Sequence, residues 1–67
     1  MISLFINGEP VELPQAMSVA ALLDARGLAG KRVAVERNGE IVPKSHHSSV
    51  AIQAGDRLEI VVAVGGG

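Results

Sequence analysis

The run of three glycines at residues 65–67 is the first candidate for chemistry in this 67-residue sequence. It follows a strand-like run from Leu58 to Val64, and glycines have no side chains that would keep a thread out of a narrow channel. The carboxylate of Gly67 is ionised at neutral pH, since an α-carboxyl group has a pKa of about 3.3–3.7. These features predict that Gly67 is inserted into another protein's active site; the alternative is a frayed terminus.

Two adjacent histidines, His46 and His47, are the second candidate, either as metal ligands or as a general base. Adjacent side chains diverge, and the sequence shows no third ligand or orienting carboxylate at a suitable spacing. Ser45, Ser48 and Ser49 flank the histidines, but a serine nucleophile needs a base, an orienting group and an oxyanion hole on a rigid scaffold. We interpret all five residues as a solvated loop, with no catalytic residue and no metal site.

The composition predicts one small domain that is held together by aliphatic burial. Cysteine is absent, which excludes disulfides and thiolate metal sites, and Phe5 is the only aromatic residue. A net charge of −1, with lysine and arginine scattered rather than clustered, argues against nucleic acid as a partner. The longest apolar run is too short to span a bilayer, and residues 1–4 lack the basic start of a signal peptide. We expect a cytoplasmic protein with no membrane partner.

Periodicity and turn residues predict the elements that position these candidates. The strand pattern alternates apolar and polar residues, and Asn7-Gly8 and Asn38-Gly39 are strong signals for two-residue hairpin turns. Ser18 is a suitable N-cap for a helix, and Gly27 suits its left-handed C-cap, with Leu28 folding back as in a Schellman ending. The pattern predicts strands at 2–6, 11–13, 33–36, 41–42 and 57–64, a helix at 19–26 and a polar loop at 44–49.

The order ββαβββ favours an α+β fold, in which a mixed sheet of about five strands wraps around one helix. Placing the last strand beside the first, in the centre of the sheet, buries the apolar faces of both. We expect a domain at residues 1–64 and a flexible tail at 65–67. The predicted core is Ile2, Leu4, Ile6, Val19, Leu22, Leu23, Val33, Val35, Leu58 and Ile60.

Phe5 and Val61 point away from this core by alternation. If the first and last strands pair, the two side chains would be neighbours. A contiguous apolar patch would indicate a partner surface, whereas single exposed apolar residues need no explanation. The sequence leaves both interpretations open.

Several local strings resemble the sulfur carrier proteins of the thiamine pathway, which are ubiquitin-like domains of the β-grasp fold. They are Asn7-Gly8-Glu9, the string NGEIVPK at residues 38–44, the string GDRLEI at residues 55–60 and the terminal Gly-Gly. The string at 38–44 is the most discriminating, and the resemblance covers the whole chain. Family members often carry arginine where Lys44 stands, so a bidentate contact there is not expected.

The resemblance implies a carrier that is a substrate of partner enzymes and has no catalytic residues of its own. An adenylating, E1-like enzyme would use ATP to activate the carboxylate of Gly67, and sulfur from a donor protein would then give a C-terminal thiocarboxylate. Thiazole synthase would receive this sulfur for the thiazole ring of thiamine. Gly66 and Gly65 would give the tail access to these sites, and Phe5, Val61 and Ala63 would form the partner-binding surface. No bound cofactor is implied.

Other functions remain open at this stage. A carrier for molybdopterin synthesis shares Gly-Asp before the last strand and the terminal Gly-Gly, although NGEIVPK and the short length favour the thiamine branch. A ubiquitin-like modifier would join Gly67 to a lysine, and branched conjugates in a cell extract would reveal it. A non-covalent adaptor would function without Gly67.

Overall fold

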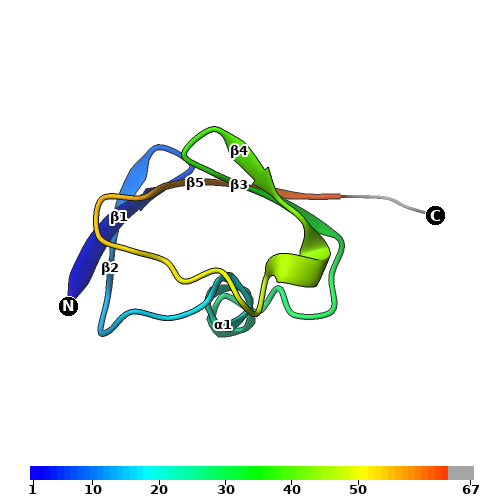
Figure 1. Cartoon of the computed structure of the whole chain (residues 1–67), viewed down its shortest axis with the longest axis horizontal. Helices are drawn as coiled ribbons and strands as arrows, with labels where there is room; N and C mark the ends of the chain where they lie inside the picture. Colours follow the sequence, from blue (N-terminus) through cyan, green and yellow to red (C-terminus); the bar gives the residue numbers. More distant parts are fainter. Residues whose placement is uncertain (64–67) are drawn as a thin grey trace.

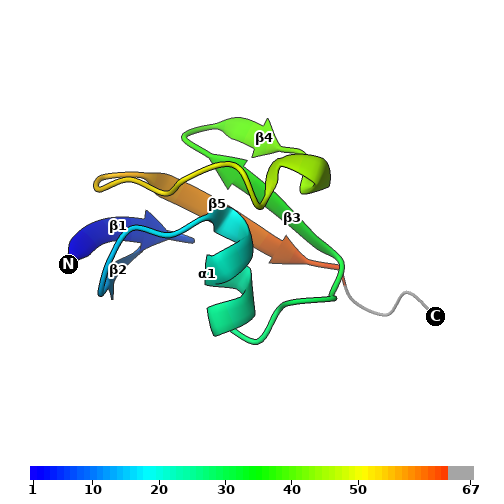
Figure 2. The ribbon, with the colours of Figure 1, turned by 60° about the horizontal axis from the view of Figure 1, so that its bottom comes forward.

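The chain folds into a five-stranded mixed sheet that curves over a single helix (Figures 1 and 2). The computed structural model describes residues 1–63. The elements are β1 (Ile2–Ile6), β2 (Glu9–Leu13), α1 (Val19–Ala25), β3 (Val33–Arg37), β4 (Glu40–Val42), the 3-10 helix η1 (Lys44–His46) and β5 (Arg57–Val62). The predicted order ββαβββ is confirmed, and η1 replaces the first part of the expected polar loop. The expected tail at 65–67, and the domain boundary after residue 64, lie outside the described residues.

The sheet has the strand order β2-β1-β5-β3-β4, so β5 lies beside β1 in its centre as the sequence predicts. These two strands are parallel, and the other neighbouring pairs are antiparallel. Figure 1 shows α1 beneath the concave face and the segment after η1 passing along the same face to the start of β5. Both central strands are therefore covered on one face only, which fits their alternating sequences.

Both hairpin turns form as predicted. Asn7 and Gly8 have φ angles of 52° and 82°, and Asn38 and Gly39 have φ angles of 54° and 87°. Positive φ at both central residues defines a type I′ turn, whose twist matches that of the strands it joins. The turns fix the two hairpin registers, with Ile6 opposite Glu9 and Arg37 opposite Glu40.

The ends of α1 also follow the local sequence. The backbone N–H of Ala21 donates to Oγ of Ser18 at 3.1 Å, which satisfies one of the free donors of the first turn. Gly27 has a φ of 74°, and the N–H of Leu28 donates to the carbonyl of Leu23 at 2.8 Å. This second bond is the six-to-one contact of a Schellman motif. The helix stops there, and the chain returns toward β3.

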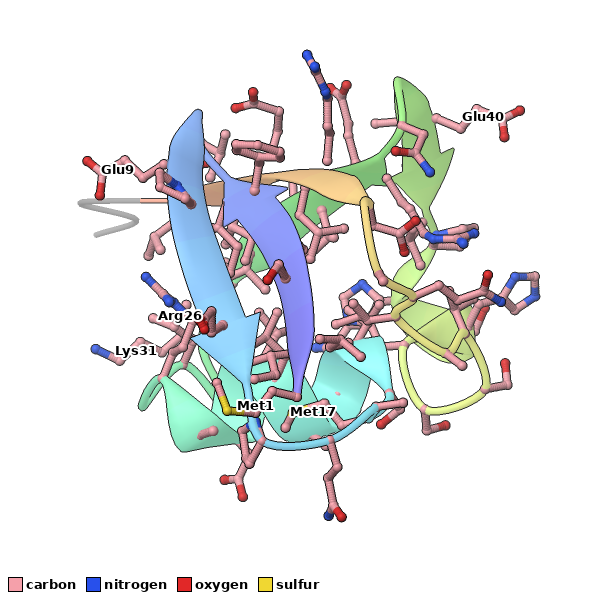
Figure 3. The ribbon with its side chains drawn as sticks, turned by 90° about the vertical axis from the view of Figure 1, so that its left-hand side faces the viewer. Met1, Glu9, Met17, Arg26, Lys31 and Glu40 are labelled. Atoms are coloured by element: carbon pink, nitrogen blue, oxygen red, sulfur yellow. The ribbon has the colours of Figure 1, made fainter. Side chains whose placement is uncertain are left out.

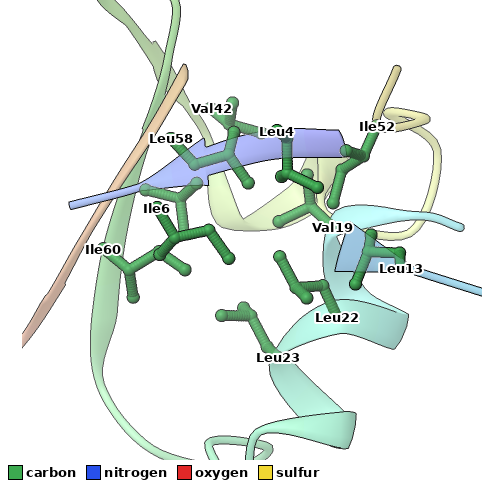
Figure 4. Packing of buried hydrophobic residues seen from close by; sticks show 11 residues of the cluster. Leu4, Ile6, Leu13, Val19, Leu22, Leu23, Val42, Ile52, Leu58 and Ile60 are labelled. Carbon is green, nitrogen blue, oxygen red and sulfur yellow. The ribbon is translucent and has the colours of Figure 1, made fainter. Parts of the chain in front are cut away.

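The core lies between α1 and the concave face of the sheet (Figure 4). Eight of the ten predicted core residues are buried, whereas Ile2 and Val33 are only partly buried. The structure adds Leu13, Val42 and Ile52. Ile52 is fully buried although it lies outside any strand or helix, because the N–H of Ile52 donates to the carbonyl of Met17 and ties this irregular segment to the entry of α1.

The side chain of Asn7 continues the pairing between β1 and β5 beyond the last residue of β1. Its Nδ2 donates to the carbonyl of Ile60 at 3.1 Å, and its Oδ1 accepts from the N–H of Ile60 at 2.8 Å. On the opposite edge of β5, Oδ1 of Asn38 accepts from the N–H of Arg57 at 2.9 Å. Each asparagine thus forms a turn and binds the central strand.

We expect Asn7→Ala to lower the free energy of unfolding by about 2–3 kcal/mol. The change removes two hydrogen bonds to Ile60, each worth about 1 kcal/mol, and places a side chain with a Cβ but no polar group in the left-handed region at a further cost of about 1 kcal/mol. Asn7→Gly tolerates the positive φ and isolates the hydrogen bonds, so its effect should be smaller than that of Asn7→Ala. Urea unfolding measures both, and wild-type stability of Asn7→Gly would show that the amide contributes nothing.

Candidate functional site

The chain leaves the sheet at the end of β5, close to the loop that follows α1. Beyond β5, the N–H of Ala63 donates to the carbonyl of Arg32 at 2.9 Å. This bond holds the last described residue against the segment that leads into β3. The predicted reactive residue Gly67, and Gly66 and Gly65 before it, lie outside the described residues. The geometry therefore defines where the tail begins.

Of the two interpretations that the sequence leaves open for Phe5 and Val61, the structure contradicts a contiguous apolar patch. Both side chains are exposed, but the register places Phe5 opposite Arg57, with the Arg57 guanidinium 5.6 Å from the centre of the Phe5 ring. Val61 lies four residues further along β5, about 13 Å away at the usual rise per residue, and faces Ala34 of β3. The candidate partner surface is thus divided between the two ends of β5.

A groove of about 660 Å³ lies at the second of these ends, between α1, the loop after it and β3. We call it the β5-end groove. Leu23, Leu28 and Val33 contribute apolar side chains to it, and Val61 and Ala63 line it from β5 and the residue after it. Two of the three predicted surface residues therefore belong to one concave feature beside the root of the tail.

Basic residues from separate parts of the chain also meet at the β5-end groove. Lys31 and Arg32 come from the loop before β3, and Lys44 comes from η1. Of residues 1–63, no aspartate or glutamate lines the groove, although the whole chain has seven acidic and six basic residues. The sequence predicts no basic cluster, because only the pair at residues 31–32 is contiguous and Lys44 joins it through the fold.

The two histidines have different surroundings, which corrects their interpretation as a pair of solvated residues. His46 is exposed, whereas His47 is buried, and Nε2 of His47 lies 3.2 Å from the carbonyl oxygen of Val42. The carbonyl of His47 accepts from the N–H of Ala20 at 2.7 Å, so this residue joins η1 to α1. Ser49 donates from Oγ to the carbonyl of His46, a local turn contact.

Within residues 1–63, the structure shows neither a metal site nor a membrane-spanning helix. No three or more histidine, aspartate or glutamate side chains are grouped so as to hold a metal ion. The same residues include no helix with the length and apolar character needed to cross a bilayer.

Asp56 differs from the other acidic residues, which are exposed or partly buried. Its side chain is buried and accepts four hydrogen bonds: from Nε of Arg37 at 2.7 Å, from a second guanidinium nitrogen at 3.4 Å, from Nδ2 of Asn38 at 3.2 Å and from the N–H of Gln53 at 2.9 Å. Burial acts to raise the pKa of Asp56, but the hydrogen bonds and the charge of Arg37 outweigh it and hold that pKa below its usual value. Asp56 fixes the start of β5 and is a structural residue.

The family comparison covers nearly the whole chain. A model of the ThiS family matches residues 4–67. The crystal structure of the thiamine biosynthesis protein (ThiS) from Geobacter metallireducens superimposes with a TM-score of 0.83 at 30% identity, covering 98% of this chain and 100% of that one. The five-stranded sheet with one helix is thus the β-grasp arrangement expected from the sequence.

Two similar proteins differ widely in length. Over 66 residues, the chain is 52% identical to a thiazole synthase of Paramagnetospirillum magneticum and 36% identical to the uncharacterized protein ycf40 of Porphyra purpurea. Each match covers 98% of this chain, but 93% of the Porphyra protein and only 20% of the thiazole synthase. The chain therefore spans about a fifth of the length of the thiazole synthases it matches.

Proposed function

Because the chain belongs to the ThiS family, we propose that it is the sulfur carrier for the thiazole ring of thiamine and that the carboxylate of Gly67 carries the sulfur. The observation that carries this proposal is the family match, which extends through the three glycines to residue 67. The similarity of the whole chain to part of a thiazole synthase supports thiazole synthase as the enzyme that receives the sulfur. The proposed site of action is the cytoplasm.

The chemistry begins with activation of a poor acyl donor. The Gly67 carboxylate attacks the α-phosphorus of ATP in the active site of an adenylating enzyme, which releases pyrophosphate and leaves an acyl-adenylate. Sulfur that the donor protein delivers at the oxidation level of sulfide then attacks the acyl carbon. The bond from that carbon to the phosphate oxygen breaks, and AMP leaves with the electron pair, because AMP is a far better leaving group than an oxide ion. The product is a thiocarboxylate on Gly67. In this scheme ATP and both reactions belong to the partner enzymes, and the chain is their substrate.

The residues of this chain present the carboxylate. Gly66 and Gly67 have no side chains, so an extended segment of this sequence passes through a channel that would exclude bulkier residues. The contact between Ala63 and Arg32 fixes the point from which that segment starts. A fixed starting point reduces the volume that the carboxylate must search to reach the α-phosphate.

We expect the pure protein to gain the mass that corresponds to replacing one oxygen by sulfur when it is incubated with ATP, a sulfur source and the adenylating enzyme. Intact-mass spectrometry measures the gain, and fragmentation locates it. Omission of the sulfur source should instead yield the acyl-adenylate. An unchanged mass with an enzyme that activates another carrier in parallel would refute the proposal. Sulfur on any residue except Gly67 would refute the assigned site.

A further inference from the structure

The β5-end groove combines an apolar interior with a basic rim at the root of the tail. Leu23, which is buried, and Leu28, which is partly buried, provide apolar surface in the interior of the groove. Lys31, Arg32 and Lys44 line the same groove. Lys31 extends away from the body of the protein in Figure 3. Within residues 1–63, the only salt bridge joins Arg37 to Asp56, so none of these three cations is paired with a carboxylate of that region.

The proposed function brings an enzyme surface close to this groove. Residues 64–67 are four residues long, and four residues reach at most about 14 Å even when fully extended. An active site that receives the carboxylate of Gly67 must therefore open within about 14 Å of Ala63. Because Ala63 lines the β5-end groove, the opening of that active site lies within the same distance of the groove.

We propose that the β5-end groove is the docking surface for thiazole synthase, and that the enzyme fills it with an acidic segment bearing at least one large apolar side chain. This inference rests on the proposed function. Carboxylates of the segment pair with Lys31, Arg32 and Lys44, and the apolar side chain packs against Leu23 and Leu28. Opposite charge steers the encounter and fixes the orientation, whereas the apolar contact supplies most of the affinity.

A polypeptide fits the groove better than the other anionic ligands. A small anion such as phosphate needs closely spaced donors, whereas the apolar interior of this groove offers it nothing. Single-stranded nucleic acid uses aromatic platforms for its bases. Among residues 1–63, no phenylalanine, tyrosine or tryptophan lines the groove, and the ring of His47, which does line it, is buried. Thiazole synthase is the partner that the comparisons connect to this chain, because two thiazole synthases each contain a segment similar to this chain within one polypeptide.

We expect Arg32→Glu and Lys44→Glu each to weaken binding of the full chain to thiazole synthase at least tenfold at low salt. The affinity of the wild type should fall as salt rises, and that dependence should be smaller in both variants because they make fewer charge contacts. Isothermal titration calorimetry measures both quantities. In Arg32→Glu the carbonyl that binds Ala63 is retained, so the variant tests the side chain while the backbone contact stays intact.

Arg26→Glu is the matched control. Arg26 is exposed at the end of α1 and does not line the groove. Its replacement by glutamate changes the net charge by the same amount as each of the two groove variants. Its affinity should stay within twofold of the wild type, and thermal unfolding should show that all three variants are folded. Val61→Asp tests the apolar wall in the same titration and should also weaken binding at least tenfold, because it puts a charge on that wall. Val61 is 62% exposed, so the change should not disturb the packing of the core.

Three results would overturn the docking proposal. The first is that both groove variants bind thiazole synthase with wild-type affinity. The second is that Arg26→Glu loses as much affinity as the groove variants. The third is that the groove variants bind the adenylating enzyme more weakly but bind thiazole synthase normally. Titration with ATP alone covers the small-anion alternative: saturable shifts of the Lys31, Arg32 and Lys44 amide resonances would overturn the assignment to a polypeptide. Failure of the proposed function is separately visible, because the wild type would then gain no sulfur in the mass assay whatever the binding titrations show.

Discussion

One alanine added after Gly67 is expected to reduce formation of the thiocarboxylate at least a hundredfold. The addition moves the carboxylate by roughly 3.5 Å along the chain, and displacement of a reacting group by even about 1 Å costs on the order of a hundredfold in rate. Under the proposed mechanism, it also puts a methyl group on the reacting residue, which is otherwise glycine. The rate of AMP formation with the adenylating enzyme, and the intact mass of the product, measure the effect.

The fold should not change in this variant, because the addition lies beyond the last core residue, Ile60. Its urea midpoint should therefore equal that of the wild type. An alanine inserted after Met1, which is 85% exposed, is the matched control and should be activated at the normal rate. Normal activation of the C-terminally extended chain would contradict the mechanism at Gly67 and would leave the family assignment intact.

Asp56→Ala is expected to lower the free energy of unfolding by about 2–3 kcal/mol. Removing one member of a fully buried ion pair costs about 3–5 kcal/mol, but the Arg37 side chain is 30% exposed and regains some solvation. The N–H of Gln53 and the amide of Asn38 also lose their acceptor. The total stability of a domain of this size is roughly 3–10 kcal/mol, so a large share of it depends on one carboxylate.

The same carboxylate makes stability depend on pH. The pKa of Asp56 is lower in the folded state than in the unfolded chain, where it is about 3.9. Its contribution is therefore complete above about pH 4–5 and is lost as the pH falls through the folded-state pKa. The difference in free energy of unfolding between the wild type and Asp56→Asn should be constant near neutral pH and should become smaller in acid.

Urea unfolding at a series of pH values measures this difference. Glu59→Ala is the control, because Glu59 is an exposed carboxylate of the same strand, and its effect should stay below about 0.5 kcal/mol. A pH-independent difference between wild type and Asp56→Asn would show that the charge of Asp56 does not stabilise the fold.

The parts of the fold that the sequence predicts correctly depend on neighbouring residues. Asn-Gly dipeptides set the hairpin turns, because only residues that tolerate positive φ fit both positions. Ser18 and Gly27 set the two ends of α1 for equally local reasons, since each makes its capping contact within four residues of its own position. The place of β5 beside β1 follows from the one apolar face that each strand has, because neighbouring strands bury both of these faces against the same core.

The parts that the sequence does not predict depend on contacts between distant segments. Asp56 and its partner Arg37 are 19 residues apart, and nothing in the pattern near Asp56 separates it from the exposed acidic residues. The separation of Phe5 from Val61 is a matter of register. A slip by an even number of residues leaves every side chain on the same face, so alternation cannot fix the register of a parallel pair. The basic groove is likewise not predictable from the sequence, because Lys44 meets Lys31 and Arg32 only in the folded chain.

The parallel pairing of β1 with β5 determines how the domain bears mechanical load. A pull on Met1 and on the chain beyond Ala63 acts along both strands in opposite directions. The bonds from Phe5 to Asp56 and from Asn7 to Leu58, together with the two side-chain bonds from Asn7 to Ile60, all lie across that pull. They must break together, whereas the bonds of a hairpin pulled from its open end break one at a time. A pull between the two ends of the chain is therefore opposed by all four of these bonds at once.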